Sequence, residues 1–323
     1  MALPLDLQLD LQLDLQLDLQ LNGYRGLDFG AEDLTQKRLA GICRAYRADG
    51  GGRFLATVIT DSLPILEHRL EALAGCLEAD ATIRDTVAGI HVEGPFISAE
   101  PGFVGAHPPE HACEASPAAM ERLLEAGRGH VRMVTLAPER DPGFRTISFL
   151  AGRGVLVAAG HCDPSLELLR ESCAAGLSCF THLGNGCPHL LPRHDNILHR
   201  VLACEELPFV TLIADGVHLP PFLLGAILRW LGPDRAIVVS DATAAAGMGA
   251  GTFQLGGQAV VVGEDGAAWS ADRTHLVGST ATLSQLRRVL ADVGQTAAAI
   301  DRLIAMNPLR ALAAAAARGS HAP

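Results

Sequence analysis

A buried strand that ends in a carboxylate is the feature that most constrains this chain. The apolar residues of the segment 87–92 predict a short buried strand, and a Gly-Pro pair stops it, so Glu93 falls at its carboxyl end. Three later apolar segments are followed closely by His161, His182 and Asp241. Barrel and open α/β enzymes carry their chemistry at the carboxyl ends of parallel strands. We therefore expect these four side chains to meet at one face of a parallel sheet.

Eight apolar segments predict strands, and most are separated by segments with the apolar spacing of helices. This alternation is typical of the (β/α)8 barrel, which takes ~250 residues, and the chain of 323 residues is long enough to form one. The predicted strands span 17–21, 54–60, 87–92, 131–136, 155–159, 177–181, 209–214 and 236–240. The predicted helices span 34–48, 64–76, 118–126, 144–151, 166–175, 221–231, 281–293, 297–305 and 308–317. We therefore predict an α/β fold, a TIM-type barrel.

From Leu5 to Leu21 the chain repeats Leu-Asp-Leu-Gln four times. Alternation at period two predicts a strand, but only one copy can be the first strand of a compact barrel. The last copy runs into the turn Asn22-Gly23, so we place residues 1–16 outside the core. The barrel then spans 17–318, with a hairpin inserted at about 252–269 and a loose tail at 319–323.

The charge balance limits the partners of the chain. A formal net charge of -11 and a pI near 5.6 disfavour binding to nucleic acid or to anionic membranes, both of which need a basic face. An anionic substrate therefore needs a local basic pocket. Lys37 is the only lysine and lies in a polar, helical segment, so we do not expect a two-metal site bridged by a carbamylated strand lysine.

Targeting and redox signals are weak. No apolar run approaches the ~20 residues of a membrane span, and no basic N-terminal region precedes an uninterrupted apolar core, so no signal peptide is predicted. The eight cysteines form no Cys-x-x-Cys pair, which is typical of reduced core thiols. We expect a soluble cytoplasmic protein.

The strand-end residues suit a catalytic metal centre. Glu93, His161 and His182 supply one oxygen and two nitrogen donors and leave a fourth position for water, an arrangement that suits zinc or another divalent ion. A bound cation lowers the pKa of water and polarises a carbonyl, and Asp241 can then move the proton to a leaving nitrogen. A histidine alone is more often a hydrogen-bonded core or surface residue. Three ligands at the same ends of successive strands favour hydrolysis of an amide or ester.

Polar groups in the loops at the same face could hold an anionic group of the substrate. Asn185, Arg193 and His218 offer an amide, a guanidinium fork and an imidazole, although each could equally belong to a solvated loop. Gly278-Ser279 could offer backbone N–H groups. The loop 98–111 is long enough to be an active-site loop.

At these residues the sequence resembles the N-acetylglucosamine-6-phosphate deacetylases, a family of the amidohydrolase superfamily. The resemblance runs from about residue 17 to residue 312 and is specific because several motifs occur together. The stretches that carry it are Asp18-Leu19-Gln20-Leu21-Asn22-Gly23, His91-Val92-Glu93-Gly94-Pro95-Phe96, Gly160-His161, Thr181-His182-Leu183-Gly184-Asn185, Asp215-Gly216-Val217-His218 and Ser240-Asp241-Ala242.

The resemblance implies roles for these residues. Glu93, His161 and His182 match the ligands of one divalent metal ion, with zinc as the expected ion. Asp241 matches the catalytic acid/base, and His107 matches the histidine that helps to polarise the acetamide carbonyl. The substrate-binding positions that it implies are Ala106, Asn185, Gly186, Arg193 and His218.

The reaction that the resemblance implies is hydrolysis of the acetamide of N-acetylglucosamine 6-phosphate to glucosamine 6-phosphate and acetate. It also implies a homodimer, because the active site of the family borrows a phosphate-binding side chain from a second subunit. Gln20 and Asn22 stand where many amidohydrolases have a His-x-His pair. As in some members of the family, this favours one metal over two.

The chain departs from the family pattern in three places. The family begins with strands of a small β-sandwich, and here the Leu-Asp-Leu-Gln repeat stands in that region. The strands that complete the sandwich, normally after a segment like Met306-Asn307-Pro308, are absent, so we expect a bare barrel. Gly184, Gly186 and Cys187 replace larger residues in the loop after His182.

Two alternatives stay open at this stage. The same chemistry could act on another N-acyl amino sugar or on a cyclic amide. The chain could also be an inactive, truncated barrel that is kept as a binding partner or is a degraded gene product. The complete set of metal ligands argues against the inactive barrel.

Overall fold

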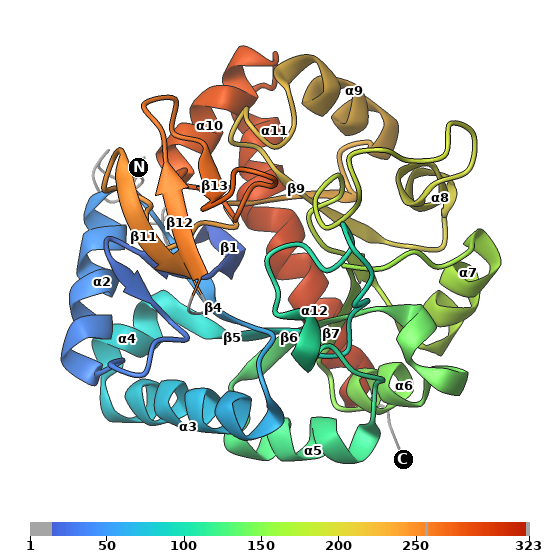
Figure 1. Cartoon of the computed structure of the whole chain (residues 1–323), viewed down its shortest axis with the longest axis horizontal. Coiled ribbons are helices and arrows are strands. Elements are labelled where there is room, and N and C mark those ends of the chain that lie inside the picture. Colours follow the sequence, from blue (N-terminus) through green and yellow to red (C-terminus); the bar gives the residue numbers. More distant parts are fainter. Residues whose placement is uncertain (1–14, 256–257, 321–323) are drawn as a thin grey trace, which may run out of the picture.

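The computed structural model describes residues 15–255 and 258–320. Most of the region 1–16, which we predicted to lie outside the core, and most of the predicted tail, 319–323, fall outside these residues. Figure 1 shows a central barrel of strands with helices around it. The last copy of the repeat forms β1, which spans Leu17–Leu21 as predicted.

Eight strands form one sheet, and every neighbouring pair is parallel. Their order in the sheet follows the chain, as in a (β/α)8 barrel. The strands are β1 (Leu17–Leu21), β4 (Arg53–Ile59), β5 (Val87–Glu93), β6 (Val131–Leu136), β7 (Leu156–Ala159), β8 (Cys179–Phe180), β9 (Phe209–Ile213) and β10 (Ala236–Val239). The predicted barrel is confirmed, and each predicted strand corresponds to one of the eight.

The barrel closes between its first and last strands through backbone bonds near their carboxyl ends. The N–H of Asp241 donates to the carbonyl of Gln20 at 3.0 Å, and the N–H of Asn22 donates to the carbonyl of Ala242 at 2.8 Å. Leu21 and Ala242 also form a parallel bridge. Closure pairs the two strands that would otherwise be the edges of the sheet. It also fixes the end of β10, where Asp241 lies.

The helices cover the outside of the barrel (Figure 1). Two short helices, α4 and α8, were not predicted because six and seven residues are too few to show a helical period. Their signal is the N-cap: Asp80 accepts from the N–H of Thr82, and Asn196 accepts from the N–H of His199. The helices are α2 (Gln36–Ala48), α3 (Leu63–Ala79), α4 (Ala81–Thr86), α5 (Pro117–Ala126), α6 (Arg145–Gly152), α7 (Leu166–Ala175), α8 (Ile197–Ala203), α9 (Pro221–Leu231), α10 (Leu283–Asp292), α11 (Ala297–Asp301) and α12 (Asn307–Gly319).

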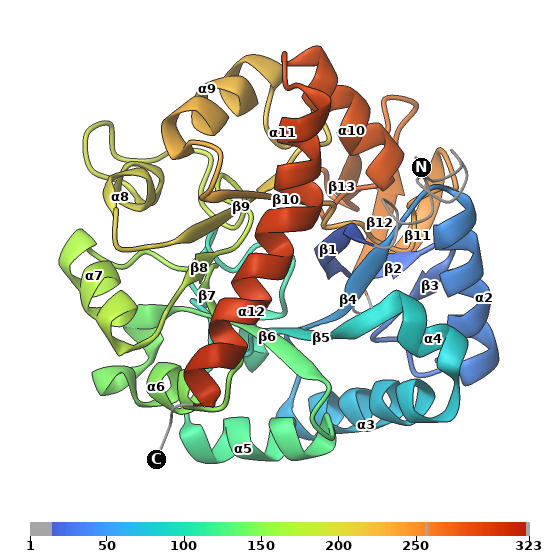
Figure 2. The ribbon, with the colours of Figure 1, turned by 180° about the vertical axis from the view of Figure 1, so that it is seen from behind.

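Helix α12 crosses the amino-terminal end of the barrel, as the view from behind shows (Figure 2). Its small residues Ala311 and Ala315 are buried against the lower layer of the barrel interior, which includes Leu17 and Leu19 of β1. A π-type turn at Arg302–Met306 joins α11 to α12, where we predicted two separate helices. The proline near the start of α12 lacks an N–H, and the first turn of a helix tolerates this.

A small antiparallel sheet follows β10, where we predicted a hairpin at about 252–269. It has three strands, β11 (Gly251–Leu255), β12 (Gln258–Val262) and β13 (Ala268–Ser270), so the prediction missed one strand. The third strand is only three residues long, which is too short for a clear alternation. Apolar residues of this sheet pack with Ile59, at the end of β4, so the sheet covers one side of the barrel mouth.

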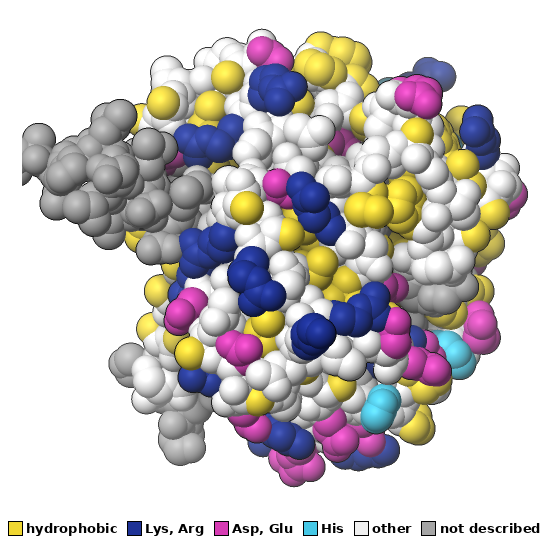
Figure 3. Space-filling view, turned by 90° about the vertical axis from the view of Figure 1, so that its left-hand side faces the viewer, with side chains coloured by type: hydrophobic (Ala, Val, Ile, Leu, Met, Phe, Trp, Pro, Cys, Tyr) yellow, Lys and Arg dark blue, Asp and Glu magenta, His cyan; other side chains and the backbone are white. Residues whose placement is uncertain are grey.

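One flank of the molecule, which carries α2 and the small sheet, presents basic and acidic side chains with hydrophobic ones between them (Figure 3). Over the described part of this flank, charges of both signs are mixed, so it carries no large field of one sign. Among the described residues, no helix has the length and apolar character that crossing a bilayer requires.

Leu19 offers a test of how the barrel interior is packed. Its side chain is fully buried in the layer that α12 closes. Replacing it by Ala leaves a cavity that the surrounding strands fill only in part, so Leu19→Ala should lower the free energy of unfolding by about 2–5 kcal/mol. Urea denaturation measures the change. Phe222→Ala is the control, since Phe222 is 79% exposed, and a similar loss in both variants would contradict this packing.

Candidate active site

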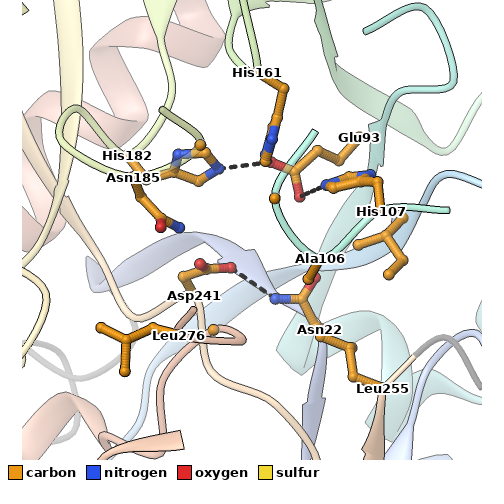
Figure 4. A pocket seen from close by; sticks show the side chains of 14 residues that line it. Asn22, Glu93, Ala106, His107, His161, His182, Asn185, Asp241, Leu255 and Leu276 are labelled. Atoms are coloured by element: carbon orange, nitrogen blue, oxygen red, sulfur yellow. Dashed lines mark hydrogen bonds and ion pairs between the residues drawn. The ribbon is translucent and has the colours of Figure 1, made fainter. Parts of the chain in front are cut away.

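Glu93, His161 and His182 converge above the ends of β5, β7 and β8. The Nε2 atom of His182 lies 2.8 Å from Oε1 of Glu93, and that of His161 lies 3.4 Å from the same oxygen. One ligand atom from each residue lies within 4.8 Å of the other two, and all three residues are buried. Figure 4 shows the three side chains pointing toward one another. The grouping expected from the sequence is therefore present.

The donor set fits a metal cation. Nδ1 of His161 lies 2.8 Å from the carbonyl of Phe103, so this nitrogen carries the proton and Nε2 is left as a ligand. Among the described residues, the ion-pair partners of Glu93 are His107, His161 and His182, and none is a Lys or Arg. A buried carboxylate needs a compensating positive charge. One divalent ion between these groups would supply it.

The mutual contacts of the cluster shift its protonation. Burial raises the pKa of Glu93, but hydrogen bonds and charges of His161 and His182 outweigh burial and hold the pKa well below its ordinary value. Burial lowers the pKa of His182, whereas the contact with Glu93 raises it, and the net shift is upward. Both shifts favour an ionised Glu93 next to a positive charge. A bound cation would favour the same ionised form of Glu93.

Three site residues have left-handed backbone conformations. The φ angles are 52° at His161, 33° at His182 and 48° at Asp241. This region is uncommon for residues other than glycine, and such strain persists where the surrounding structure holds it. Each residue follows the end of a barrel strand, so the chain turns there while the side chain points across the barrel mouth.

Asp241 follows β10 and faces the cluster of Glu93, His161 and His182, which we call the candidate metal cluster. Its Oδ1 accepts a hydrogen bond from the Asn22 amide at 2.8 Å and from the Gln20 amide at 3.1 Å. Burial and the charge of Glu93 raise the pKa of Asp241, although the charge of His182 and the bond from Asn22 lower it in part. A raised pKa makes this carboxylate a better proton acceptor, and the accepted proton can be returned to a leaving group.

Gln20 connects the two carboxylates. Its amide nitrogen lies 3.0 and 3.1 Å from the two carboxylate oxygens of Glu93 and also contacts Asp241. Its amide oxygen accepts a bond from the hydroxyl of Thr181 at 2.7 Å, which fixes the orientation of the amide. From the sequence, Gln20 and Asn22 are expected only to mark a one-metal site. Their bonds show that they also position the acids.

His107 lies in the loop after β5, beside the candidate metal cluster. Its Nδ1 is 2.7 Å from the hydroxyl of Thr60, and its Nε2 is 3.8 Å from Oε2 of Glu93. Its ring centroid lies 4.3 Å from that of His161. Burial, followed by the charge of His161, lowers the pKa of His107 to about 3. The ring is therefore neutral near pH 7.

Two adjoining cavities receive most of the predicted substrate-binding residues. Ala106, Asn185, Gly186 and Gly278 line the inner pocket together with the candidate metal cluster, His107 and Asp241 (Figure 4). His218 lines a larger cavity of about 500 Å³, which we call the outer cavity. The two share Asn185 and Gly186, so the outer cavity adjoins the inner pocket.

Two predicted substrate-binding residues lie outside both cavities. Arg193 is exposed on the loop before α8. Ser279 is buried, its N–H donates to the carbonyl of Asp241 at 2.8 Å, and its hydroxyl donates to the carbonyl of Ser240 at 2.6 Å. Ser279 therefore supports the backbone around Asp241.

Sequence reasoning did not find the apolar wall of the inner pocket. Ile59, Leu255 and Leu276 line it beside Ala106. Leu255 ends β11, and Leu276 follows β13, so both reach the pocket only because the small sheet folds over the barrel mouth. No local motif marks such residues. The wall leaves a small apolar space next to the acid and the candidate metal cluster.

Metal-dependent amide hydrolases of the amidohydrolase type combine a parallel barrel with a carboxylate, two imidazoles and a facing aspartate at its mouth. The described residues show the same combination.

No family profile matches the chain. The N-acetylglucosamine-6-phosphate deacetylase of Rattus norvegicus is 30% identical over 93% of this chain and 74% of its own length. The N-acetylgalactosamine-6-phosphate deacetylase of a Shewanella species is 31% identical over 73% of this chain and 57% of its own length.

A solved structure of a deacetylase of the same name also resembles this chain. A mutant of N-acetyl-D-glucosamine-6-phosphate deacetylase from Mycobacterium smegmatis, in complex with N-acetyl-D-glucosamine-6-phosphate, superposes with a TM-score of 0.83 and 32% identity, over 92% of this chain and 77% of that one. The chain belongs to the N-acetylglucosamine-6-phosphate deacetylase family. It covers 66% and 54% of the length of two bacterial relatives, so it spans only part of these proteins.

Glu93 tests the candidate metal cluster directly. Glu93→Ala removes the only carboxylate of the three ligands, so we expect metal content to fall from about one divalent ion per chain to a small fraction of that. Elemental analysis of the purified protein measures it. Glu71→Ala, an exposed acid on α3, should retain the full content. Equal metal content in the two variants would mean that the ion binds elsewhere.

Proposed function

We propose that the chain hydrolyses the acetamide of N-acetylglucosamine 6-phosphate to glucosamine 6-phosphate and acetate. The observation that carries the proposal is the placement of Asp241, buried and with a raised pKa, across a small pocket from Glu93, His161 and His182. Membership of the family supports the same reaction.

We propose zinc as the ion, because one carboxylate and two imidazoles are a donor set that zinc prefers. When bound, such an ion lowers the pKa of water and polarises a carbonyl oxygen. Glu93, His161 and His182 would hold it. The bond from His161 to the carbonyl of Phe103 keeps one ring nitrogen free for this purpose.

The chain itself supplies the proton transfers. Asp241 accepts a proton from the attacking water as the oxygen–carbon bond forms, and it returns that proton to the amide nitrogen as the carbon–nitrogen bond breaks. The carboxyl product gives its remaining proton to solvent, and acetate and the free amine leave. Its raised pKa suits both halves of this transfer. Neutral His107 lies close enough to the cluster to hydrogen-bond the acetamide carbonyl oxygen.

The pocket wall supports an acetyl group as the acyl part. The side chains of Ile59, Ala106, Leu255 and Leu276 bound the inner pocket on one side and can contact a methyl group. In this arrangement the sugar extends past Asn185 and Gly186 into the outer cavity. His218 lines that cavity and can bind the phosphate.

We include a homodimer in the proposal. Arg193 is exposed and lines neither cavity, so it would reach the phosphate of a substrate bound to a second copy of the chain. Leu190, in the same loop, is 92% exposed and can form an apolar contact between the copies. The cytoplasmic location and the lack of a nucleic-acid partner stay predictions.

The first experiment is amine release by the metal-loaded chain. N-acetylglucosamine 6-phosphate, its galactosamine epimer and the unphosphorylated sugar are offered side by side. Fastest release from N-acetylglucosamine 6-phosphate supports the proposal. Preference for another of these sugars would instead favour the alternative of a different N-acyl amino sugar, and no release from any of them would favour the inactive barrel.

Asp241→Asn tests the proton transfer. An amide cannot accept and return the proton, so we expect kcat to fall by about 10²–10⁴-fold. Metal content should stay near that of the unmodified chain, because Asp241 is not one of the three proposed ligands. Steady-state kinetics and elemental analysis on the same sample measure both. Retained turnover would remove Asp241 from this role.

Asn22→Ala tests how the pKa of Asp241 is set. Turnover needs the ionised form, so activity should be lost as pH falls through the pKa of Asp241. The bond from Asn22 favours that ionised form and lowers the pKa. Its removal should therefore move the acidic limb of the kcat/KM profile to higher pH. A profile that keeps its acidic limb in place would show that another group controls the limb.

A further inference from the structure

The outer cavity contains two histidines, His189 and His275, to which the proposed function gives no role. They line the cavity together with His218, and its volume is about 500 Å³. It shares Gly105, Asn185, Gly186 and Leu276 with the inner pocket. A molecule whose amide lies in the inner pocket would therefore place its other end among these imidazoles.

His218 presents one ring nitrogen without a protein partner. Its Nδ1 lies 2.7 Å from Oδ2 of Asp215, so Nδ1 carries a proton and donates it. The backbone N–H groups of Val217 and His218 also donate to Asp215, each at 2.9 Å, and hold that carboxylate in place. The His218 side chain is 4% exposed, and its buried Nε2 has no partner among the described residues.

His275 repeats this arrangement with one more residue in the chain of bonds. The Thr274 hydroxyl donates to Oδ1 of Asp272 at 2.9 Å. Its oxygen lies 3.0 Å from Nδ1 of His275, and since its own proton is already engaged it accepts from that nitrogen. The Nε2 atom of His275 is also buried without a partner among the described residues.

The two arrangements favour the same ligand chemistry. In each, a carboxylate lies behind the ring and orients it, directly or through a hydroxyl, so Nε2 is left for a ligand that can share a proton with it. Two such nitrogens in one cavity suit a group with several anionic oxygens, such as a phosphate. His189 differs, because its Nε2 lies 3.2 Å from the carbonyl of Thr274 and is already used.

We propose that His275 is a second anion-binding residue of the outer cavity, which together with His218 holds the phosphate of the substrate and sets the preference for a phosphorylated sugar. This inference rests on the proposed function for the identity of the sugar. The anion site itself does not depend on the proposed function, because residues of a single chain form it.

The test compares phosphorylated with unphosphorylated sugar. The metal-loaded full chain carries Asp241→Asn to prevent turnover, and isothermal titration calorimetry measures its affinity for N-acetylglucosamine 6-phosphate and for N-acetylglucosamine. His275→Gln, added to this variant, removes a hydrogen bond to a charged group. We therefore expect the affinity for the phosphorylated sugar to fall about 10–100-fold. The affinity for the unphosphorylated sugar should change less than about 2-fold, because no charged bond is lost.

Two further variants separate a binding role from a structural one. His275→Lys places N–H donors and a positive charge at this position and should recover most of the affinity for the phosphorylated sugar. His68→Gln makes the same change as His275→Gln at an exposed histidine of α3, and neither affinity should change. Equal losses for both sugars in His275→Gln, without recovery by lysine, would overturn the proposal.

Inorganic phosphate separates this inference from the proposed function. It is titrated into the same metal-loaded variants without any sugar. If the sugar phosphate proves not to be the substrate, weaker phosphate binding by His275→Gln than by His68→Gln still supports the anion site. Equal phosphate affinity in these two variants overturns the site, even when the deacetylase reaction is established.

Discussion

The site depends on one amide that lies between two buried acids. Gln20 donates to both oxygens of Glu93 and to Asp241, while its backbone carbonyl accepts from the N–H of Asp241. Buried carboxylates are costly without hydrogen bonds, and a neutral amide supplies donors without adding a competing cation. Because Gln20 lies on β1, the same residue joins the first strand to the last. Closure of the barrel therefore also sets the spacing of Glu93 and Asp241.

The backbone around the site supports residues in unfavourable conformations. Left-handed φ angles cost of order 1–3 kcal/mol each and persist where other contacts hold them. At His182 the backbone N–H donates to the hydroxyl of Thr211 at 2.7 Å, and at His161 the ring is fixed by the carbonyl of Phe103. Asp241 is held on both sides, by Gln20 and by Ser279. The barrel thus provides the contacts that keep three side chains aimed at one small space.

Local signals in the sequence predict the barrel and the four strand-end residues, because an apolar run, a chain-breaking residue and a polar side chain occur within a few positions. The bounds of β1 and β6 agree with the predictions for the same reason. Leu255 and Leu276 could not be predicted, since their contact with the pocket depends on how the small sheet folds over it. The engagement of Ser279 likewise depends on a partner, Asp241, that is distant in sequence.

Two glycines, Gly105 and Gly186, allow the inner pocket and the outer cavity to lie close together. A Cβ at Gly186 would lie 2.8 Å from Nδ1 of His161, and a Cβ at Gly105 would lie 3.1 Å from Cε1 of the same ring. Both have positive φ, 59° in each case, so a side chain at either position would also strain the backbone. The two loops therefore pack against the imidazole of His161, and both glycines line both cavities. In the proposed reaction, residues such as His275 can then change how the far end of the substrate is held without displacing the groups proposed to act on its amide.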